Sequence, residues 1–264
     1  RIDHILTIGF QRCIRSLPGI TTIQKQNFVL APFTTDIFYE CGGAIKPTQT
    51  SITSCQLNIV NHGMGICQRR FWINIEMPKR NDIKKVIICT GHHSEQIENY
   101  IKKLKFNLNI FISKDGNFPL GTGGALLKAM KRIKKNFFLI YGDSYLPINF
   151  QNLSKCFKKN PSDIMLSVYK NRNTLDKSNI LIKNNYLLYK KGTKNKDYKY
   201  IDYGLSIFGK NCIKLFPKKQ SFDLSDIFYS LSKKKLISYK IVNQRFYEIG
   251  SIKGIKDFKN YLNK

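Results

Sequence analysis

The sequence predicts an α/β protein built on a mostly parallel sheet with helices on both faces. Three short apolar runs, at 85–90, 108–113 and 137–141, alternate with two segments of helical periodicity. The first and third runs end at a glycine, as buried parallel strands commonly do. Strand–helix–strand order requires crossover connections, which place helices against the faces of the sheet.

The two helices between these strands are predicted from periodicity and from an N-cap. Ser94 precedes Ile97, Tyr100, Ile101 and Leu104, which follow the i, i+3, i+4, i+7 spacing of one helix face. The second helix is predicted over 122–135.

After about residue 163 the sequence predicts an antiparallel second half of the same domain. The hairpin turn Asn184-Asn185 joins two of its short strands. Strands are predicted over 164–169, 180–183, 186–189, 201–208, 236–242 and 246–249, and helices over 224–234 and 252–262. No linker separates this half from the first, so we expect one continuous domain.

Size and cysteine usage set further bounds. A chain of 264 residues is long enough to bury a substantial core, and no apolar run approaches the ~18 residues that span a bilayer. The seven cysteines are scattered and form no C-x-x-C pair. This pattern favours free thiols in a reducing compartment, and we expect a cytoplasmic protein.

The net charge of +28 is the most unusual bulk property. A strongly basic protein can bind nucleic acid, an anionic membrane or phosphate-bearing substrates. However, 36 of the 45 basic residues are Lys, and Asn is abundant too, a bias that A-T-rich coding DNA produces. The aromatic residues fall mainly inside predicted strands and on helix core faces, so we expect neither a nucleic-acid nor a membrane partner.

The charge also divides the chain near residue 80. Residues 1–80 contain three Lys, whereas residues 81–264 contain the other 33. We therefore predict an atypical N-terminal segment at 1–80 and a main domain at 81–264.

A glycine-rich turn at 120–126 is the first candidate binding element. Gly121, Gly123 and Gly124 allow a close approach of the backbone to a ligand, and free N–H groups at a helix start suit an anion. The spacing fits neither G-x-G-x-x-G nor G-x-x-x-x-G-K-[ST]. The alternative is an ordinary tight turn.

Two acidic residues follow predicted strands and are candidate metal ligands. Asp143 comes after the run 137–141, and Glu248 lies in a short strand before Gly250. Ligands bind at the carboxyl ends of parallel strands, and Mg²⁺ typically takes one or two carboxylates plus substrate phosphates. The alternative is that each acid caps a turn. His92 and His93 are expected to be exposed loop residues.

Four motifs in order give the chain a specific resemblance. They are Leu120-Gly-Thr-Gly-Gly-Ala-Leu126, Tyr141-Gly-Asp-Ser-Tyr145, Ile201-Asp-Tyr-Gly-Leu205 and Arg245-Phe-Tyr-Glu-Ile-Gly-Ser251. From about residue 81 to the C-terminus, the sequence resembles the sugar-1-phosphate nucleotidyltransferases, and is most similar to the branch with heptose and mannose 1-phosphate guanylyltransferases.

The resemblance implies a Rossmann-like fold of the nucleotide-diphospho-sugar transferase type and a Mg²⁺-dependent reaction. The sugar phosphate oxygen would attack the α-phosphate of an NTP, giving an NDP-sugar and pyrophosphate, largely through positioning and charge neutralisation. It implies catalytic roles for Asp143 and Lys191, and metal binding by Asp143 and Glu248, the latter standing where many relatives have Asp. It implies substrate contacts by Gly121, Thr122, Gly123, Gly124, Asn179, Asp202 and Gly204.

The resemblance breaks at the family's N-terminal signature, G-G-x-G-T-R followed by P-K-P. Only Gly42-Gly43 is found here, followed by Ala-Ile-Lys-Pro. Either the loop has diverged, or residues 1 to about 70 derive from a shifted reading frame or are joined from elsewhere, and we favour the second explanation. Both explanations place the activity of this chain in question. The alternative functions are an NDP-sugar-dependent glycosyltransferase and a basic nucleic-acid-binding protein; a homo-oligomer is equally compatible with the sequence.

Overall fold

A computed structural model describes residues 2, 4–8, 77–78, 81–91, 94–103, 108–171, 174–249 and 251–263. All structural statements below concern these residues.

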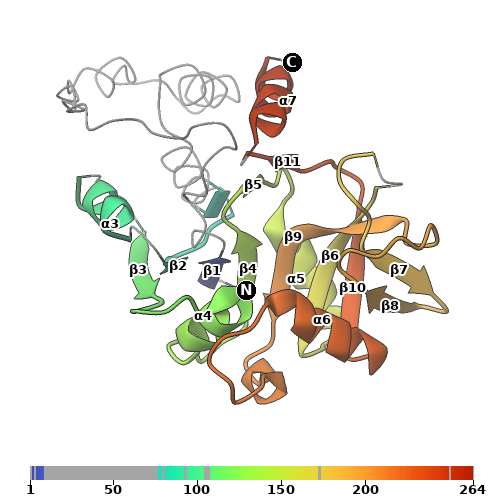
Figure 1. The fold of residues 1–264 in the computed structure, drawn as a ribbon, viewed down its shortest axis with the longest axis horizontal. Helices are drawn as coiled ribbons and strands as arrows, with labels where there is room; N and C mark the ends of the chain where they lie inside the picture. The colour runs from blue at the N-terminus through green and yellow to red at the C-terminus, as the bar shows by residue number, and fades with distance from the viewer. Residues whose placement is uncertain are drawn as a thin grey trace.

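A mixed sheet forms the centre of the molecule (Figure 1). Its path runs in the order β10-β6-β9-β4-β1-β2-β3. The strands are β1 (His4–Ile8), β2 (Lys85–Thr90), β3 (Asn109–Lys114), β4 (Phe137–Tyr141), β6 (Ile164–Lys170), β9 (Tyr200–Phe208) and β10 (Ile237–Val242). Strands β4, β1, β2 and β3 are mutually parallel, β10 is parallel to β6, and β9 is antiparallel to both of its neighbours. The predicted mostly parallel, mixed sheet is confirmed.

Two smaller pairings complete the strands. The hairpin of β7 (Ile180–Lys183) and β8 (Tyr186–Tyr189) attaches to β9, and its turn residues Asn184 and Asn185 have φ of 49° and 60°. These left-handed conformations are those of the tight hairpin turn that the sequence predicts. Separately, β5 (Ser144–Tyr145) pairs antiparallel with β11 (Tyr247–Glu248).

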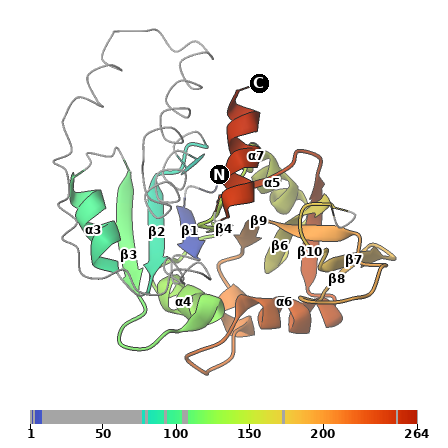
Figure 2. The ribbon, with the colours of Figure 1, turned by 45° about the horizontal axis from the view of Figure 1, so that its top comes forward.

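Helices cover both faces of the sheet, as predicted (Figure 2). Apolar side chains of α3 (Ser94–Lys103), α5 (Phe150–Lys159) and α7 (Ile252–Leu262) join one buried cluster. Those of α4 (Gly121–Met130), α6 (Leu224–Lys233) and the short helix η3 (Cys212–Leu215) join the other.

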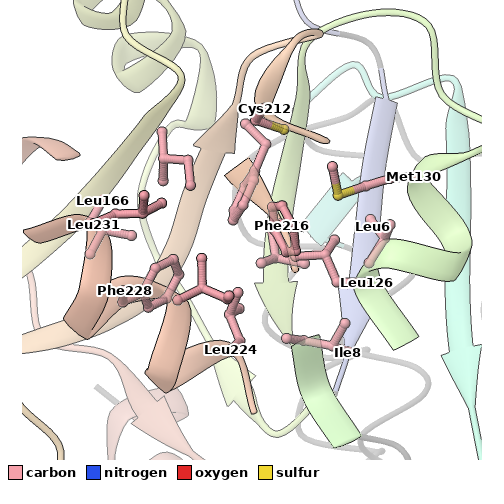
Figure 3. Close-up of a cluster of buried hydrophobic side chains, with 14 of the residues drawn as sticks. Leu6, Ile8, Leu126, Met130, Leu166, Cys212, Phe216, Leu224, Phe228 and Leu231 are labelled. Atoms are coloured by element: carbon pink, nitrogen blue, oxygen red, sulfur yellow. The ribbon is translucent and has the colours of Figure 1, made fainter. Parts of the chain in front are cut away.

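Strand β1 contributes to both clusters because alternate side chains point to opposite faces of a sheet. Ile5 packs into the first cluster, while Leu6 and Ile8 pack into the second, all with no exposed surface. Figure 3 shows Leu6 and Ile8 in one layer with Leu126 of α4 and Phe228 of α6. Each such side chain stabilises the fold by roughly 1.5–3 kcal/mol.

The structure differs from the sequence prediction in five elements. The patterns do not predict β1, β5, α5 or η3, and the predicted helix over 122–135 ends instead at Met130. Helix α5 has the signals of a helix, because Asn149 accepts a hydrogen bond from Gln151 N (2.8 Å) and Phe150, Leu153 and Phe157 form an apolar face.

The predicted division near residue 80 stays a prediction, because residues 9–76 lie outside the described part of the chain. Strand β1 belongs to the same sheet as the strands after residue 80, paired in register with β2 and β4. Among the described helices, none is long and apolar enough to cross a membrane.

Candidate functional site

The predicted site residues gather at one edge of the sheet. Tyr141 ends β4 beside Ile8, the last residue of β1, and Gly142 N donates to Ile8 O (2.7 Å). Strand β9 begins at this same edge because it runs antiparallel to β4. Asp143, which follows β4, and Asp202, near the start of β9, therefore lie at the edge where parallel sheets bind ligands.

Asp202 is the centre of a buried polar network. Its side chain is 8% exposed, with Oδ1 accepting from Gly204 N (3.0 Å) and Oδ2 from the Tyr141 hydroxyl (3.0 Å). Its backbone N–H donates to Asn179 Oδ1 (3.0 Å), and Asn179 Nδ2 lies 3.5 Å from the Tyr189 hydroxyl. The predicted residues Asn179 and Asp202 are thus in direct contact.

Burial controls the protonation of this network. It raises the pKa of Asp202 to about 6, although the hydrogen bonds from Gly204 and Tyr141 act in the opposite direction. Burial, and then the charge of Asp202, also raise the pKa of Tyr141 and of Tyr189 above the usual range for phenols. Both tyrosines therefore remain neutral hydroxyl groups beside the carboxylate.

A bulge in β9 sets the direction of Asp202. The register of β6 and β9 shifts between Leu166 and Val168, opposite Gly204. Gly204 has φ of 89°, and a Cβ there would lie 3.2 Å from Tyr141 Cδ2. A glycine is therefore required both by the backbone and by the Tyr141 ring that packs on it.

The two predicted metal ligands lie on neighbouring chain segments. Glu248 in β11 pairs with Ser144 in β5, and Ile249 N donates to Asp143 O (2.8 Å). The Asp143 carboxylate accepts a long hydrogen bond from Ser144 Oγ (3.3 Å). The small β5–β11 sheet is the element that places the backbone segments of Asp143 and Glu248 side by side.

The Glu248 carboxylate also serves the start of α7. Its Oε2 accepts from Ser251 N (3.1 Å) and Ser251 Oγ (2.6 Å), while Ser251 Oγ caps Gly254 N (3.0 Å). Two carboxylates are the donor type and number that Mg²⁺ uses alongside phosphate oxygens. Within the described residues, no group of three or more His, Cys, Asp or Glu side chains is arranged around a common metal position.

The glycine-rich turn packs closely against residues 220–224. A Cβ on Gly121 would lie 2.6 Å from Phe222 O, one on Gly123 would lie 2.4 Å from the Phe222 ring, and one on Gly124 would lie 2.1 Å from Gln220 O. These separations are too short for any side chain, so the three glycines have a packing reason that is independent of a ligand.

The expectation of free N–H groups at this turn needs correction. The N–H groups of Gly123 and Gly124 both donate to Phe222 O, at 2.9 Å and 3.3 Å. Thr122 Oγ1 accepts a hydrogen bond from the N–H of Leu224 (2.9 Å), the first residue of α6. The side chain of the N-cap residue Asp223 makes no capping hydrogen bond, so Thr122 caps this helix instead. The turn therefore joins the starts of α4 and α6.

Asp223 links this turn to the Asp202 network. Its Oδ1 lies 3.3 Å from Thr122 Oγ1, and its charge, with that of Asp202, contributes to raising the pKa of Tyr189. Lys191 is exposed and follows Lys190, whose N–H donates to Asn179 O (2.8 Å).

Sequence reasoning gave no role to Tyr141, Tyr189 or Asp223. Each had a signal: Tyr141 directly precedes Gly142-Asp143, Tyr189 directly precedes the lysine pair, and Asp223 stands at the start of a predicted helix. Gly42, Gly43, His92 and His93 lie outside the described residues.

Part of the chain is similar in sequence to a known protein. No protein-family model matches the chain. The D-glycero-alpha-D-manno-heptose 1-phosphate guanylyltransferase of Campylobacter jejuni is 32% identical over 102 residues, which are 39% of this chain. The match spans 43% of that relative, less than half of its length.

Solved structures share the fold. HddC from Yersinia pseudotuberculosis, complexed with GMP-PN, has a TM-score of 0.66 at 17% identity and covers 99% of both chains. The inositol-1-phosphate CTP transferase from T. maritima has a TM-score of 0.62 at 15% identity, covering 80% of this chain and 91% of its own. The UDP-glucose pyrophosphorylase from Acinetobacter baumanii has a TM-score of 0.59 at 13% identity, covering 73% and 81%.

The predicted resemblance and the predicted fold type are both confirmed. Part of the sequence is similar to a heptose 1-phosphate guanylyltransferase, and the fold is shared with HddC and with the inositol-1-phosphate CTP transferase.

Proposed function

Because the chain resembles the sugar-1-phosphate nucleotidyltransferases in sequence and has their fold, we propose that it joins an NTP to a sugar 1-phosphate. The observation that carries the proposal is the gathering of Asp143, Glu248 and Asp202 at one sheet edge. These are three acidic residues of the motifs that resemble the family.

The reaction is a displacement at phosphorus. An oxygen of the sugar phosphate attacks the α-phosphorus of the NTP, the bond to the β-phosphate breaks, and pyrophosphate leaves. Such chemistry needs no covalent intermediate on the protein, because aligned reactants and neutralised charge supply most of the rate enhancement. Within the site, Lys191 is proposed to neutralise the phosphate of the sugar.

Asp143 and Glu248 are proposed to hold Mg²⁺. When bound, the ion supplies positive charge against the phosphate oxygens. The Asp143 carboxylate accepts one long hydrogen bond from Ser144 Oγ, whereas Oε2 of Glu248 accepts two shorter bonds from Ser251. Among the contacts of the described residues, Asp143 is therefore the less constrained ligand.

Asn179, Asp202 and Gly204 are proposed to form the sugar side of the site. Hydrogen bonds from Gly204 N and the Tyr141 hydroxyl fix the orientation of the buried Asp202 carboxylate. A carboxylate held in this way can accept a directional hydrogen bond from a sugar hydroxyl. The glycine-rich turn, with Gly121, Thr122, Gly123 and Gly124, is proposed to face the nucleotide, its shape fixed by the contacts to residues 220–224.

The remaining expectations are part of the same proposal. Residues 81–264 carry the sugar side and the metal side, and residues 1–80 are the atypical segment in which the triphosphate-binding signature is incomplete. The product would serve polysaccharide synthesis, with the enzyme acting in the cytoplasm.

A pyrophosphate-release assay tests the proposal. The full chain is incubated with Mg²⁺, each of the common NTPs and a set of hexose and heptose 1-phosphates. We expect release that requires both substrates, stops with EDTA and falls about a hundredfold or more in Asp143→Asn. If no pair releases pyrophosphate, or if an NDP-sugar alone serves as a glycosyl donor, the proposal is wrong.

A further inference from the structure

The edge of the sheet opposite the candidate site carries a concentration of basic residues. Four connections lie there: 131–136 before β4, 158–163 before β6, 209–216 after β9 and 233–236 before β10. Eleven of these 24 residues are Lys or Arg and one, Asp163, is acidic. The eleven, which we call the basic row, are Lys131, Arg132, Lys134, Lys135, Lys158, Lys159, Lys210, Lys214, Lys233, Lys234 and Lys235.

The strand pairing makes this row continuous. Phe137 pairs with Phe208, Phe208 with Ile164, and Ile164 with Ile237, so four adjacent strands begin or end level with one another. Adjacent strands are about 4.8 Å apart, and the four connections therefore form neighbouring parts of one edge.

Hydrogen bonds also join the connections to one another. Lys210 N donates to Asn136 Oδ1 (2.9 Å), and Gly209 N donates to Asp163 O (2.8 Å). The hydroxyl groups of Ser162 and Ser238 lie 2.6 Å apart. The row is thus held on a rigid part of the fold, and all eleven of its side chains are exposed.

Helix termini explain only part of this charge. A cation at a helix C-terminus is favourable, and α4, α5 and α6 all end at this edge. That effect is confined to the last turn and accounts for one or two residues per helix, not for eleven. A-T-rich coding explains many lysines but not their alignment along one edge. The site edge is mixed in charge: the connections 115–120 and 142–149 contain two Asp and no Lys or Arg, whereas the connection 190–199 contains five Lys and one Asp.

We propose that the basic row docks this protein on an anionic lipid surface, with the candidate site facing away from the lipid. Lysines outnumber arginine ten to one in the row, and lysine acts as a point charge, whereas base recognition in nucleic acids relies on the arginine fork. Aliphatic side chains are interleaved with the charges: Ile213 is 38% exposed and Leu236 is 44% exposed. Cations combined with exposed aliphatic groups suit the lipid interface.

This proposal differs from the expectation, drawn from composition, that no membrane partner exists. It is independent of the proposed function, because no residue of the row belongs to the candidate site. Asp143 and Asp202 lie at the other edge of the same strands, so a protein docked through the row keeps its site open to the solvent.

Vesicle co-sedimentation of the full chain tests the proposal, using phosphatidylcholine vesicles with about 30% phosphatidylserine in about 0.15 M salt. The row variant carries Lys134→Glu, Lys135→Glu, Lys158→Glu and Lys159→Glu. The matched control carries the same charge change elsewhere, at the exposed residues Lys194, Lys196, Lys253 and Lys256. We expect partitioning to fall about tenfold or more in the row variant and less than about threefold in the control.

Two further measurements separate the alternatives. The double variant Ile213→Ser, Leu236→Ser is expected to bind the same vesicles more weakly, while circular dichroism shows unchanged folding of all variants. The proposal is overturned by equal losses in row and control variants, or by equal binding to vesicles without phosphatidylserine. It is also overturned if a DNA duplex binds more tightly than the vesicles and the row variant loses that binding, because the partner is then a nucleic acid.

Discussion

Asp202 shows how strongly the chemistry of a single residue depends on its surroundings. Its sequence motif marks it as a candidate ligand, but the motif does not show that the carboxylate is buried or that Tyr141 and Gly204 donate to it. Those contacts come from β4 and from the bulge in β9, which are far apart in the sequence. For the same reason, the raised pKa of Asp202 could not be predicted from sequence.

The stability of the fold should depend on the ionisation of Asp202. Its pKa in the folded protein, about 6, lies above the ordinary value of 3.8, so the folded state binds more protons between these values. Stability contributed by this group is therefore lost as pH rises from about 4 to 6. We expect Asp202→Asn to gain stability relative to the parent by at most about 3 kcal/mol between pH 4 and pH 7.

Urea denaturation at several pH values measures this difference. Comparison of the two proteins at each pH removes the contribution of all other titrating groups. A difference in unfolding free energy that stays constant from pH 4 to pH 7 would contradict the assignment of a raised pKa to Asp202.

At the scale of elements, the glycine-rich turn was located correctly from sequence, but its physical role was only partly predicted. Glycine spacing cannot distinguish a turn that contacts a ligand from one that contacts another part of the chain. Here the contact is with Phe222 and Gln220, about a hundred residues later in the sequence. The close approach of the glycines to residues 220–222 therefore depends on the tertiary structure. The sequence alone shows only that small residues are present at the turn.

Replacement of Gly124 should test this packing role. In Gly124→Ala the new Cβ would lie 2.1 Å from the backbone oxygen of Gln220, so the start of α4 and residues 220–224 must separate. We expect a loss of about 3 kcal/mol in unfolding free energy. The control is Gly192→Ala, where φ is 70° but no atom lies within 4 Å, and the expected loss is about 1–2 kcal/mol. Because Gly124 does not have a positive φ, its loss would come from packing, and a loss below about 1 kcal/mol in Gly124→Ala would contradict the packing role.

Strand β1 illustrates why an element can be missed. Its five residues are followed by Gly9, as β2 and β4 are followed by glycine, but a single short apolar run gives little periodic evidence. Its identity as a strand depends on β2 and β4, which pair with it from both sides.

Truncation of Leu6 should show that β1 is part of the native core. Leu6 is fully buried between the sheet and the α4–α6 layer. We expect Leu6→Ala to lower the thermal stability by an amount equivalent to about 3 kcal/mol. In the control Ile241→Ala, on β10 and 39% exposed, the loss should stay below about 1 kcal/mol. If Leu6→Ala had the same melting temperature as the unsubstituted protein, residues 4–8 would not occupy the centre of the sheet.

For the whole molecule, the repeated strand–helix pattern was sufficient to predict a mixed, mostly parallel sheet with helices on both faces. The strand order was not predictable for two reasons. Strand β1, from the atypical segment 1–80, lies in the centre of the sheet, and β9 runs antiparallel between β4 and β6. The same order explains the distribution of charge. It places the candidate site at one edge and the basic row at the other.

This protein is proposed to form an NDP-sugar by attack of a sugar phosphate on an NTP. Mass spectrometry of products made from a sugar 1-phosphate labelled with ¹⁸O in its phosphate group tests it most directly. We predict an NDP-sugar that retains every labelled oxygen and pyrophosphate that contains none, and both products should form about a hundredfold or more slowly with Asp143→Asn. The absence of an NDP-sugar with every NTP, or the appearance of label in pyrophosphate, would contradict the claim.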